Sequence, residues 1–524
     1  MDSLLSRRNF IAASAAGAAA LSIPQVTAAS MGILDVKRIA RIAVHPAIGI
    51  ARVGNSKDAF YFGAEVPEAI PSGPFKDSSG AMAKQAVRFR LYAYDADGIV
   101  LGEITAEHGD VSWRVKVGNA KAAWYGADEP LDIPQAEPTK LRNAEVRDRS
   151  SLAVVSTERR VSGAGAAPRV LDGGSFLGVP VTLGEITTDG RGRLIVFPGT
   201  GDAVSVADSP PLSGFADNDG WTDTTSDGPV HARVKIGGRL FDADPGWVLC
   251  AGPNYGPGIG AGLITLYDAV FSGLVGAGRR KRSRTEFHRD IAPIFDRMTD
   301  MQWVNSGYLA TNGFGSLRDW SSEEWQARLM DRSQRNRKLR QQILAMFRDP
   351  EYSSVQPSLE PQEYGDMVSI PPTRSEPRQW LSLTPVQFAH LRSWARGDFT
   401  VGKPRIYERH ADVPLQKRPT SLDRAALDSC LGGAFHPGVE YPWISRVPWM
   451  WTRNMRLKAD ALTPNVQVYG EALTPDIATS RSGPLSQIGP GDLVKWMGVP
   501  WQADAASCRF GYVKGVSPVL PTFW

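Results

Sequence analysis

The residues best suited to unusual chemistry lie in two segments that each combine a cysteine with tryptophans or carboxylates. The first segment, SLDRAALDSCLGGAFHPGVEYPW, places Cys430 beside two glycines, where backbones can approach closely. The second segment, DLVKWMGVPWQADAASC, contains Trp496, Trp501, Asp504 and Cys508. Eight of the 15 tryptophans fall within the last 145 residues. The tryptophans in this part of the chain therefore form a hydrophobic core, line a binding surface or take part in a reaction.

Other catalytic patterns are missing from the sequence. The seven histidines show no HxH or HExxH spacing, which argues against a multi-histidine copper or zinc enzyme. There is no GxxxxGK[ST] phosphate loop and no GxSxG nucleophile elbow. Four aspartates cluster in FADNDGWTDTTSDGPV, but Thr222 stands where a calcium loop needs glycine. We therefore expect turn-forming aspartates and no metal.

Composition and charge indicate a globular protein that does not bind nucleic acid. The 524 residues are 42% hydrophobic and 22% charged, which are ordinary globular values. Lys and Arg number 59 against 55 Asp and Glu, so the formal net charge is only +4. The basic run at 279–284 is short and is typical of a solvated surface loop.

The first thirty residues resemble a twin-arginine export signal. Arg7 and Arg8 precede an apolar run of about 13 residues, whereas a membrane span needs about 20. Val26-Thr27-Ala28 is a small-residue cleavage site. We expect a signal peptide over residues 1–30 and a periplasmic or secreted protein without a stable membrane span. Translation from Met31 would instead leave the protein cytoplasmic.

Three cysteines permit at most one intramolecular disulfide. In an oxidising compartment we expect a disulfide between Cys430 and Cys508 as the structural alternative, with Cys250 outside that disulfide.

The sequence pattern of residues 38–270 predicts mainly β-strands. Val87, Phe89, Leu91 and Ala93 alternate with polar or larger residues, which predicts a half-buried strand. The turn at residues 95–98 then leads into a second strand. Further alternating segments separated by Gly/Asp turns favour a β-sandwich.

Helical patterns follow from about residue 263. Residues 323–347 predict one charged helix. Thr384 and Pro385 open another helix that stops at Gly397, and a short one spans Ser421–Leu431. The fold class is therefore α+β. We expect a β-rich, sandwich-like domain over residues 31–275 and a mixed helix- and loop-rich domain over residues 276–524 that carries the site.

Several long motifs, taken in order, resemble the cysteine tryptophylquinone-dependent amino-acid oxidases, the family of lysine ε-oxidase and glycine oxidase. These motifs are AVHPAIGIARVGNS, NDGWTDTTSDGPV, LTPVQFAHLRSWARGDF, CLGG with PGVE, and PWQADAASC. They cover most of the chain after residue 38, and several long matches in one order are more specific than any short motif.

The resemblance implies that Cys430 and Trp501 are joined by a thioether into one cofactor, cysteine tryptophylquinone. Trp496 is the alternative indole and Cys508 the alternative sulfur. The family also uses an acidic residue near the cysteine during maturation, for which Asp428 and Asp423 are candidates. The familiar four-residue spacing is not present, because position 426 is alanine.

The resemblance further implies oxidative deamination. A primary amine condenses with a quinone carbonyl as a Schiff base, a general base removes the neighbouring carbon's proton, and ammonia and hydrogen peroxide are released. Asp428, Asp504 and His436 are the candidate bases. Arg446 and Arg453 are candidate anchors for a substrate carboxylate.

The resemblance implies partners as well as a reaction. These are a small amine or amino-acid substrate and a separate flavoprotein for maturation, and we also expect a homo-oligomer. Two alternatives stay open at this point: a quinone-dependent amine dehydrogenase with a periplasmic electron acceptor, and a non-enzymatic β-sandwich protein that binds carbohydrate through its tryptophans.

Overall fold

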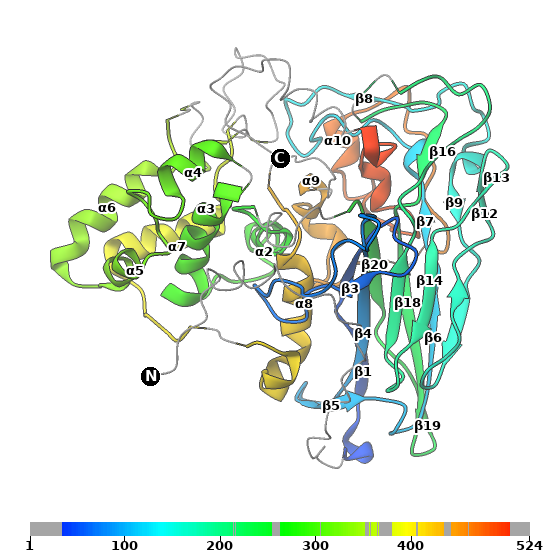
Figure 1. Ribbon diagram of the computed structural model, residues 1–524, viewed down its shortest axis with the longest axis horizontal. Helices are drawn as coiled ribbons and strands as arrows, with labels where there is room; N and C mark the ends of the chain where they lie inside the picture. Colours follow the sequence, from blue (N-terminus) through cyan, green and yellow to red (C-terminus); the bar gives the residue numbers. More distant parts are fainter. Residues whose placement is uncertain are drawn as a thin grey trace.

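The structure is a computed structural model in which a strand-rich part is joined to a helical part. It describes residues 34–503 apart from residues 213, 215, 254–261, 304, 352–355, 357, 364, 366–379, 405–406, 434–441 and 460. Figure 1 shows the strands gathered on one side of the molecule and most helices on the other. The predicted α+β class, with its sandwich-like N-terminal part, is confirmed.

Fifteen strands form one large sheet within the described residues. Its main path runs β10 (Arg159–Ser162), β6 (Asp110–Val115), β18 (Ser226–Ile236), β20 (Gly246–Ala251), β2 (Ile48–Arg52), β4 (Lys84–Tyr94), β15 (Leu194–Pro198), β14 (Gly184–Thr188) and β11 (Arg169–Val170). The side strands are β1 (Arg41–His45), β3 (Phe60–Phe62), β5 (Val100–Ile104), β7 (Gly118–Asn119), β9 (Val154–Val155) and β19 (Arg239–Asp242). Most neighbours are antiparallel, but β2 pairs with β20, and β3 with β4, in parallel.

Three small ladders complete the strands. They are β12 (Gly174–Phe176) with β13 (Val179–Val181), β16 (Ala203–Ser205) with β17 (Trp221–Asp223), and β8 (Thr139–Lys140) with β21 (Ala472–Leu473). The last ladder joins a C-terminal strand to the strand-rich part, so the later half of the chain returns to the sheet. The domain boundary expected near residue 276 stays a prediction.

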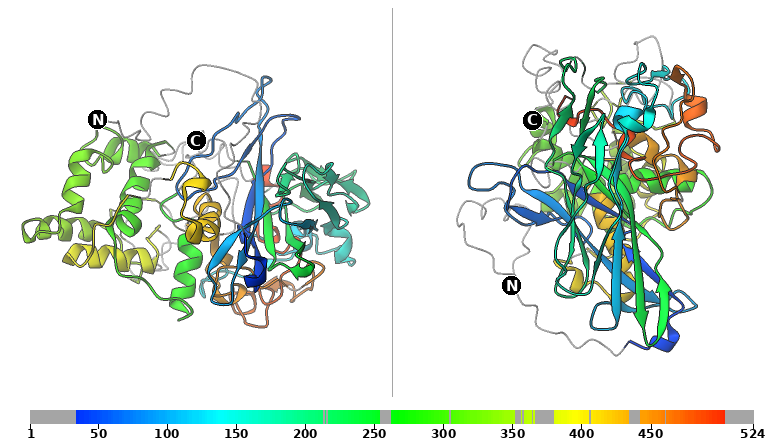
Figure 2. Two further views of the ribbon diagram at one scale, coloured as in Figure 1. Left: turned by 90° about the horizontal axis from the view of Figure 1, so that it is seen from below. Right: turned by 90° about the vertical axis from the view of Figure 1, so that its right-hand side faces the viewer.

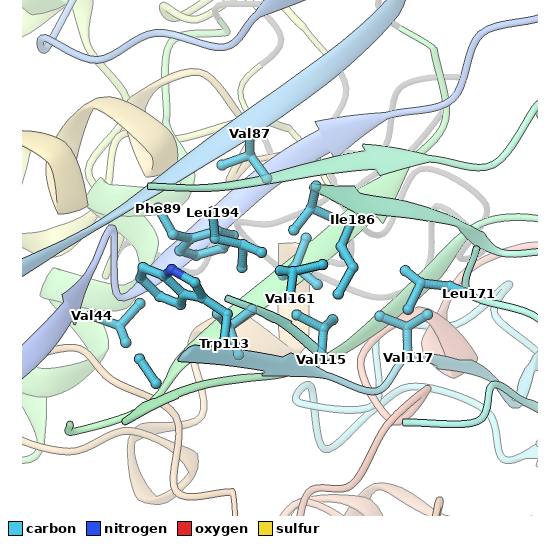
Figure 3. Close-up of a cluster of buried hydrophobic side chains, with 14 of the residues drawn as sticks. Val44, Val87, Phe89, Trp113, Val115, Val117, Val161, Leu171, Ile186 and Leu194 are labelled. Atoms are coloured by element: carbon cyan, nitrogen blue, oxygen red, sulfur yellow. The ribbon is translucent and has the colours of Figure 1, made fainter. Parts of the chain in front are cut away.

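The large sheet curls until its two ends meet, because β10 at one end lies beside β14 and β11 at the other. The enclosed core is made of side chains that alternate along the strands, as expected for strands that bury one face. Figure 3 shows Val115 and Val161 facing Leu194 and Ile186 across this core. The buried indole of Trp113 keeps a hydrogen bond, since its Nε1 donates to the carbonyl of Gly192 at 2.9 Å.

Strand β4 is buried on both faces, so the prediction of a half-buried strand was wrong. On its second face Tyr92 and Tyr94 pack with Leu422 of α8 (Arg418–Asp428) and with Leu415 just before it, and polar groups of the strand find partners in other segments. Arg90 donates to Glu65 at 2.6 Å, and the Tyr92 hydroxyl meets a ring nitrogen of His410 at 2.6 Å. These hydrogen bonds offset part of the cost of burying Arg90 and Tyr92, although Arg90 Nε has no hydrogen-bond partner among the described residues.

The remaining helices with α-helical geometry in the described residues lie mostly in one lobe. They are α2 (Leu266–Gly276), α3 (Ala292–Asp300), α4 (Ser306–Asn312), α5 (Glu323–Met330), α6 (Arg337–Met346), α7 (Pro385–Arg396), α9 (Pro442–Ser445) and α10 (Pro475–Ala478). Helices α3 to α7 form the lobe, and α8 stands between it and the sheet, as two views show (Figures 1 and 2). None of the helices in the described residues is long and apolar enough to cross a bilayer.

The helix predicted over residues 323–347 is in fact two helices, α5 and α6. The chain leaves helical geometry at Asp331, whose carboxylate accepts the backbone N–H of Ser333 at 2.7 Å and the Asn336 side-chain amide at 2.8 Å. An aspartate that binds the backbone just ahead of it competes with helical hydrogen bonding, which explains the break.

Helix α7 follows its sequence signals closely. Thr384 caps its first turn in a capping box with Gln387, and Gly397 ends it with a φ of 85°, in the left-handed region that suits glycine. The predicted start and end of this helix are confirmed.

Candidate active site

Cys430 lies two residues beyond the end of helix α8 and is 1% exposed. The helix was predicted to run to Leu431, but it ends at Asp428. The reason is that the following residues pair with the start of α2: the Cys430 carbonyl accepts the N–H of Leu266 at 2.9 Å. A Cβ at position 432 would stand 2.1 Å from the carbonyl oxygen of Thr265, so this approach requires Gly432.

Arg52, the last residue of β2, places a guanidinium against this sulfur. Its Nη2 lies 3.7 Å from Cys430 Sγ and 3.3 Å from the carbonyl oxygen of Ser429. Arg52 is 5% exposed, so its charge acts in a region from which water is largely excluded. The thiolate is the reactive form of cysteine, and a neighbouring cation favours it.

Trp501 is held at two points. Its backbone N–H donates to Asp223 Oδ2 at 3.0 Å, and its indole Nε1 donates to the carbonyl of Gly201 at 2.8 Å. Asp223 Oδ2 also accepts the Lys121 ammonium at 2.8 Å, and both side chains of this ion pair are fully buried. The backbone of Trp501 is therefore fixed by a buried ion pair, which we call the Lys121–Asp223 anchor, and its indole is fixed by Gly201.

Cys430 and Trp501, the residues predicted to form the cofactor, both lie near the same end of strand β2. Arg52 contacts Cys430, and the next residue, Val53, lies against Gly201: a Cβ at that glycine would be 3.0 Å from Val53 Cγ2 and 3.5 Å from Trp501 Cζ2. Cys430 and Trp501, which are 71 positions apart in the sequence, thus lie near consecutive residues, Trp501 by way of Gly201.

Asp428 belongs to a buried network beside Cys430. Its Oδ2 accepts from Arg424 Nε at 2.8 Å, and its Oδ1 lies 3.1 Å from the Thr265 hydroxyl oxygen. The same hydroxyl lies 3.1 Å from Asp268 Oδ2, although a hydroxyl has only one proton to donate. Burial raises the pKa of Asp428, while Arg424 and Arg297 oppose that shift. The geometry suits a carboxyl group that gains and loses a proton.

Asp423, the other acidic candidate, faces a different set of groups. Its Oδ1 accepts the backbone N–H of Ala47 at 2.6 Å and lies 2.8 Å from Nδ1 of His45. Position 426, one turn before the cysteine, is an alanine that lines a cavity of about 20 Å³ together with Glu65, Gln85 and Ser429. A cavity of this size holds one water molecule.

The other predicted residues are placed as follows. Arg446 donates two hydrogen bonds, of 2.7 and 2.8 Å, to the carboxylate of Asp132. Arg453 is exposed, and its carbonyl accepts from Arg280. Trp496 packs edge-on against Trp443 and Trp124 in the same buried cluster as Cys430. His436, Asp504 and Cys508 lie outside the described residues. The roles suggested for all of these residues stay predictions.

The aspartates expected to form turns also tie distant segments together: Asp223 Oδ1 accepts the backbone N–H of Thr225 at 2.9 Å, as in a turn, but its other oxygen reaches further. Asp223 anchors Trp501, and Asp227 Oδ1 accepts the backbone N–H groups of Leu493 and Val494 at 3.0 and 2.8 Å. No group of three or more metal-binding side chains occurs in the part of the chain that the structure describes. Sequence reasoning missed Arg52, Lys121 and Asp223 as site residues. The only signal for Arg52 and Asp223 was that both fall inside motifs that carry the family resemblance.

Asp227 should make stability depend on pH. Burial and the nearby Asp492 raise its pKa from 3.8 to about 8. The folded chain therefore keeps a proton that the unfolded chain loses, so the free energy of unfolding should fall as the pH rises from about 4 to about 8. The D227N substitution should flatten this dependence in urea unfolding, and it should cost about 1–3 kcal/mol near pH 5, because the amide cannot accept every hydrogen bond that Asp227 accepts. D110N, at an exposed position, should leave the slope unchanged; a D227N protein with the wild-type slope would contradict the assignment.

The comparisons with known proteins agree over most of the chain. Residues 45–250 match the family described as L-Lysine epsilon oxidase N-terminal, and residues 361–524 match the L-lysine epsilon oxidase C-terminal domain. L-lysine 6-oxidase from Marinomonas mediterranea is 26% identical over 558 residues, covering 91% of this chain and 72% of that protein.

Solved structures give the same result. The crystal structure of the L-Lys epsilon-oxidase from Marinomonas mediterranea matches with a TM-score of 0.68 and 25% identity, over 89% of this chain and 75% of that one. The crystal structure of that enzyme's Schiff base intermediate with L-Lys matches with a TM-score of 0.69 and 24% identity, over the same shares of the two chains.

Fold, site and comparisons together define an amino-acid oxidoreductase. Both family descriptions apply to this chain in the order and over the regions that the motifs indicated. The chain belongs to the L-lysine epsilon-oxidase family.

Proposed function

We propose that this protein oxidatively deaminates a primary amine of an amino acid by means of a cysteine tryptophylquinone made from Cys430 and Trp501, releasing ammonia and hydrogen peroxide. The observation that carries the proposal is that Cys430 lies against Arg52 at the end of β2, while the indole of Trp501 is bonded to Gly201, which packs beside the next residue, Val53.

The residues present suit this cofactor. A thioether needs a nucleophilic sulfur, and Arg52 supplies positive charge beside Cys430. A reactive indole needs a fixed ring, and Gly201 with the Lys121–Asp223 anchor supplies that. Such a group provides an electrophilic carbonyl and accepts two electrons, neither of which ordinary side chains offer.

The chain's own residues would orient the substrate and move its proton. Asp428 is buried beside Cys430 and is held by Arg424 and Thr265, so it is the described carboxyl best placed to accept a proton. Burial raises the pKa of Asp428, which strengthens its affinity for a proton. The curated relative is named for L-lysine, so lysine is the first substrate to test.

Three measurements on the mature wild-type protein test the proposal. Intact mass and peptide mapping should find one cross-linked peptide pair containing Cys430 and Trp501 with two added oxygen atoms. Phenylhydrazine should label that pair, whereas a carbohydrate-binding protein would stay unlabelled. Lysine oxidation should yield peroxide without an artificial acceptor; turnover that requires such an acceptor would indicate a dehydrogenase instead. An unmodified mass for both peptides would refute the proposal.

Asp428 can be tested as the proton acceptor by the D428N substitution. Loss of a positioned base should lower kcat/KM by roughly 10²–10⁴-fold and remove the rise of activity with increasing pH. Steady-state rates with lysine across pH check this expectation.

D423N is the matched control, because Asp423 lies on the same helix but binds His45 and Ala47. Intact mass separates the two possible roles of each carboxylate. An inactive D428N protein with a complete cross-link would identify a base, whereas a missing cross-link would identify a maturation residue. D428N with the wild-type pH profile would exclude both.

We further propose that a flavoprotein completes the cross-link in the cytoplasm before twin-arginine export of the folded enzyme. The support is Arg7-Arg8 at the head of a short apolar run. Expression of the chain alone should give protein without the cofactor, and full quinone absorbance in that protein would remove the need for a partner.

A further inference from the structure

The buried ammonium of Lys495 lies directly over an indole. Lys495 is fully buried, and its Nζ donates to Asp492 Oδ1 at 2.8 Å and to the carbonyl of Asn465 at 3.0 Å. The same Nζ stands 3.8 Å from the ring centroid of Trp124 and 5.8 Å from that of Trp496. An ammonium has three protons, so the face of Trp124 serves as its third acceptor.

These indoles belong to the same buried cluster as Cys430. The Trp496 ring stands 5.0 Å from both Trp124 and Trp443, edge to face in each case. Trp496 also lies only five positions before Trp501. A protein that oxidises one indole and releases peroxide therefore has further electron-rich rings close to that chemistry.

We infer that Lys495 is a specificity-determining residue that protects Trp124 and Trp496 from oxidation, so that Trp501 is the indole that reacts. This inference rests on the proposed function, which supplies the peroxide. When an indole carbon attacks hydrogen peroxide, a C–O bond forms, the O–O bond breaks, and the ring proton leaves with the second oxygen as water. Positive charge develops on the ring during this attack. An ammonium fixed above the ring opposes that charge, and it does so strongly where water is excluded.

The arrangement of Asp492 keeps the cation effective. Its carboxylate is shared among Lys495 and the backbone N–H groups of Asn465 and Gly489, at 2.7–3.1 Å. The negative charge of Asp492 is thus partly neutralised by backbone N–H groups, whereas the Lys495 ammonium contacts the Trp124 ring directly.

Hydrogen peroxide applied to the full mature chain, followed by peptide mapping of added oxygen, tests the inference. In the wild type, Trp124 should be oxidised several-fold more slowly than Trp451, which is equally buried at 0% exposure. In the double variant K495M/D492N, which removes both charges together, oxidation of Trp124 and Trp496 should rise several-fold, while Trp451 stays unchanged. K495R, which keeps the cation, should behave as the wild type.

Two results would overturn the inference. One is equal oxidation of Trp124 and Trp451 in the wild type, a comparison that needs no variant to fold. The other is a folded K495M/D492N protein in which Trp124 and Trp496 are as resistant as before. Neither result bears on the cross-link, because the proposed function fails only if the untreated wild type lacks the modification of Cys430 and Trp501.

Discussion

Replacing Cys430 by serine should abolish amine oxidation altogether. A hydroxyl in this position cannot supply the sulfur of a thioether, so the mature protein should lack the cross-link, the phenylhydrazine-reactive carbonyl and peroxide release. The chain should still fold, because serine is slightly smaller than cysteine and its hydroxyl can accept the hydrogen bond that Arg52 now directs at Sγ. Intact mass, absorbance and peroxide assays measured on one preparation check the expectation.

C250S is the matched control for this experiment. Cys250 is as buried as Cys430, at 1% exposure, but it lies on β20 in the core of the sheet. Its replacement should lower stability modestly and leave the cross-link and the activity in place. Phenylhydrazine labelling that survives in C430S would place the cofactor on another sulfur, such as Cys508.

The D223A substitution should have the second largest effect, on stability and on cofactor formation together. It leaves the fully buried Lys121 ammonium without its partner, and breaking a buried pair in this way costs about 3–5 kcal/mol. It also removes the acceptor of the Trp501 backbone N–H. Urea unfolding should show the loss of stability, and intact mass should show a smaller cross-linked fraction at a temperature where the chain remains folded.

The double variant K121M/D223N separates these two effects. Both charges disappear together, and the asparagine oxygen can still accept the N–H of Trp501. The cross-linked fraction should therefore rise again, whereas stability should recover only in part, because one amide oxygen cannot accept both the N–H of Trp501 and the donors of Thr225. A D223A protein that is folded and fully cross-linked would show that the Lys121–Asp223 anchor does not position the indole.

Features encoded by neighbouring residues were predictable from the sequence. Helix α7 begins at Thr384 and ends at Gly397 because its caps are set within a few residues of each end. The helix over residues 323–347 was mispredicted for a related reason: its apolar spacing continues through Asp331, but that side chain bonds to Ser333 and stops the helix. Periodicity alone could not reveal this competition.

Features that depend on distant contacts were not predictable. The carboxylate of Asp223 and the N–H of Trp501 are 278 residues apart in sequence, and nothing near Asp223 distinguishes an anchor from a turn. The second face of β4 read as exposed because Glu65 and His410, which bind its polar tips, are far away in the chain. The family resemblance selected Cys430 and Trp501, but it did not reveal which residues hold them.

The long reach of these contacts has a consequence for biosynthesis. Asp227 can form its hydrogen bonds only after Leu493 and Val494, which follow it by more than 260 residues, have been synthesised. Asp223 likewise needs Trp501. Contacts between such distant residues form late and slowly in folding. The growing polypeptide therefore exposes these two carboxylates until residues 493–501 have left the ribosome, and an enzyme that recognises Trp501 in its folded setting must act after that point.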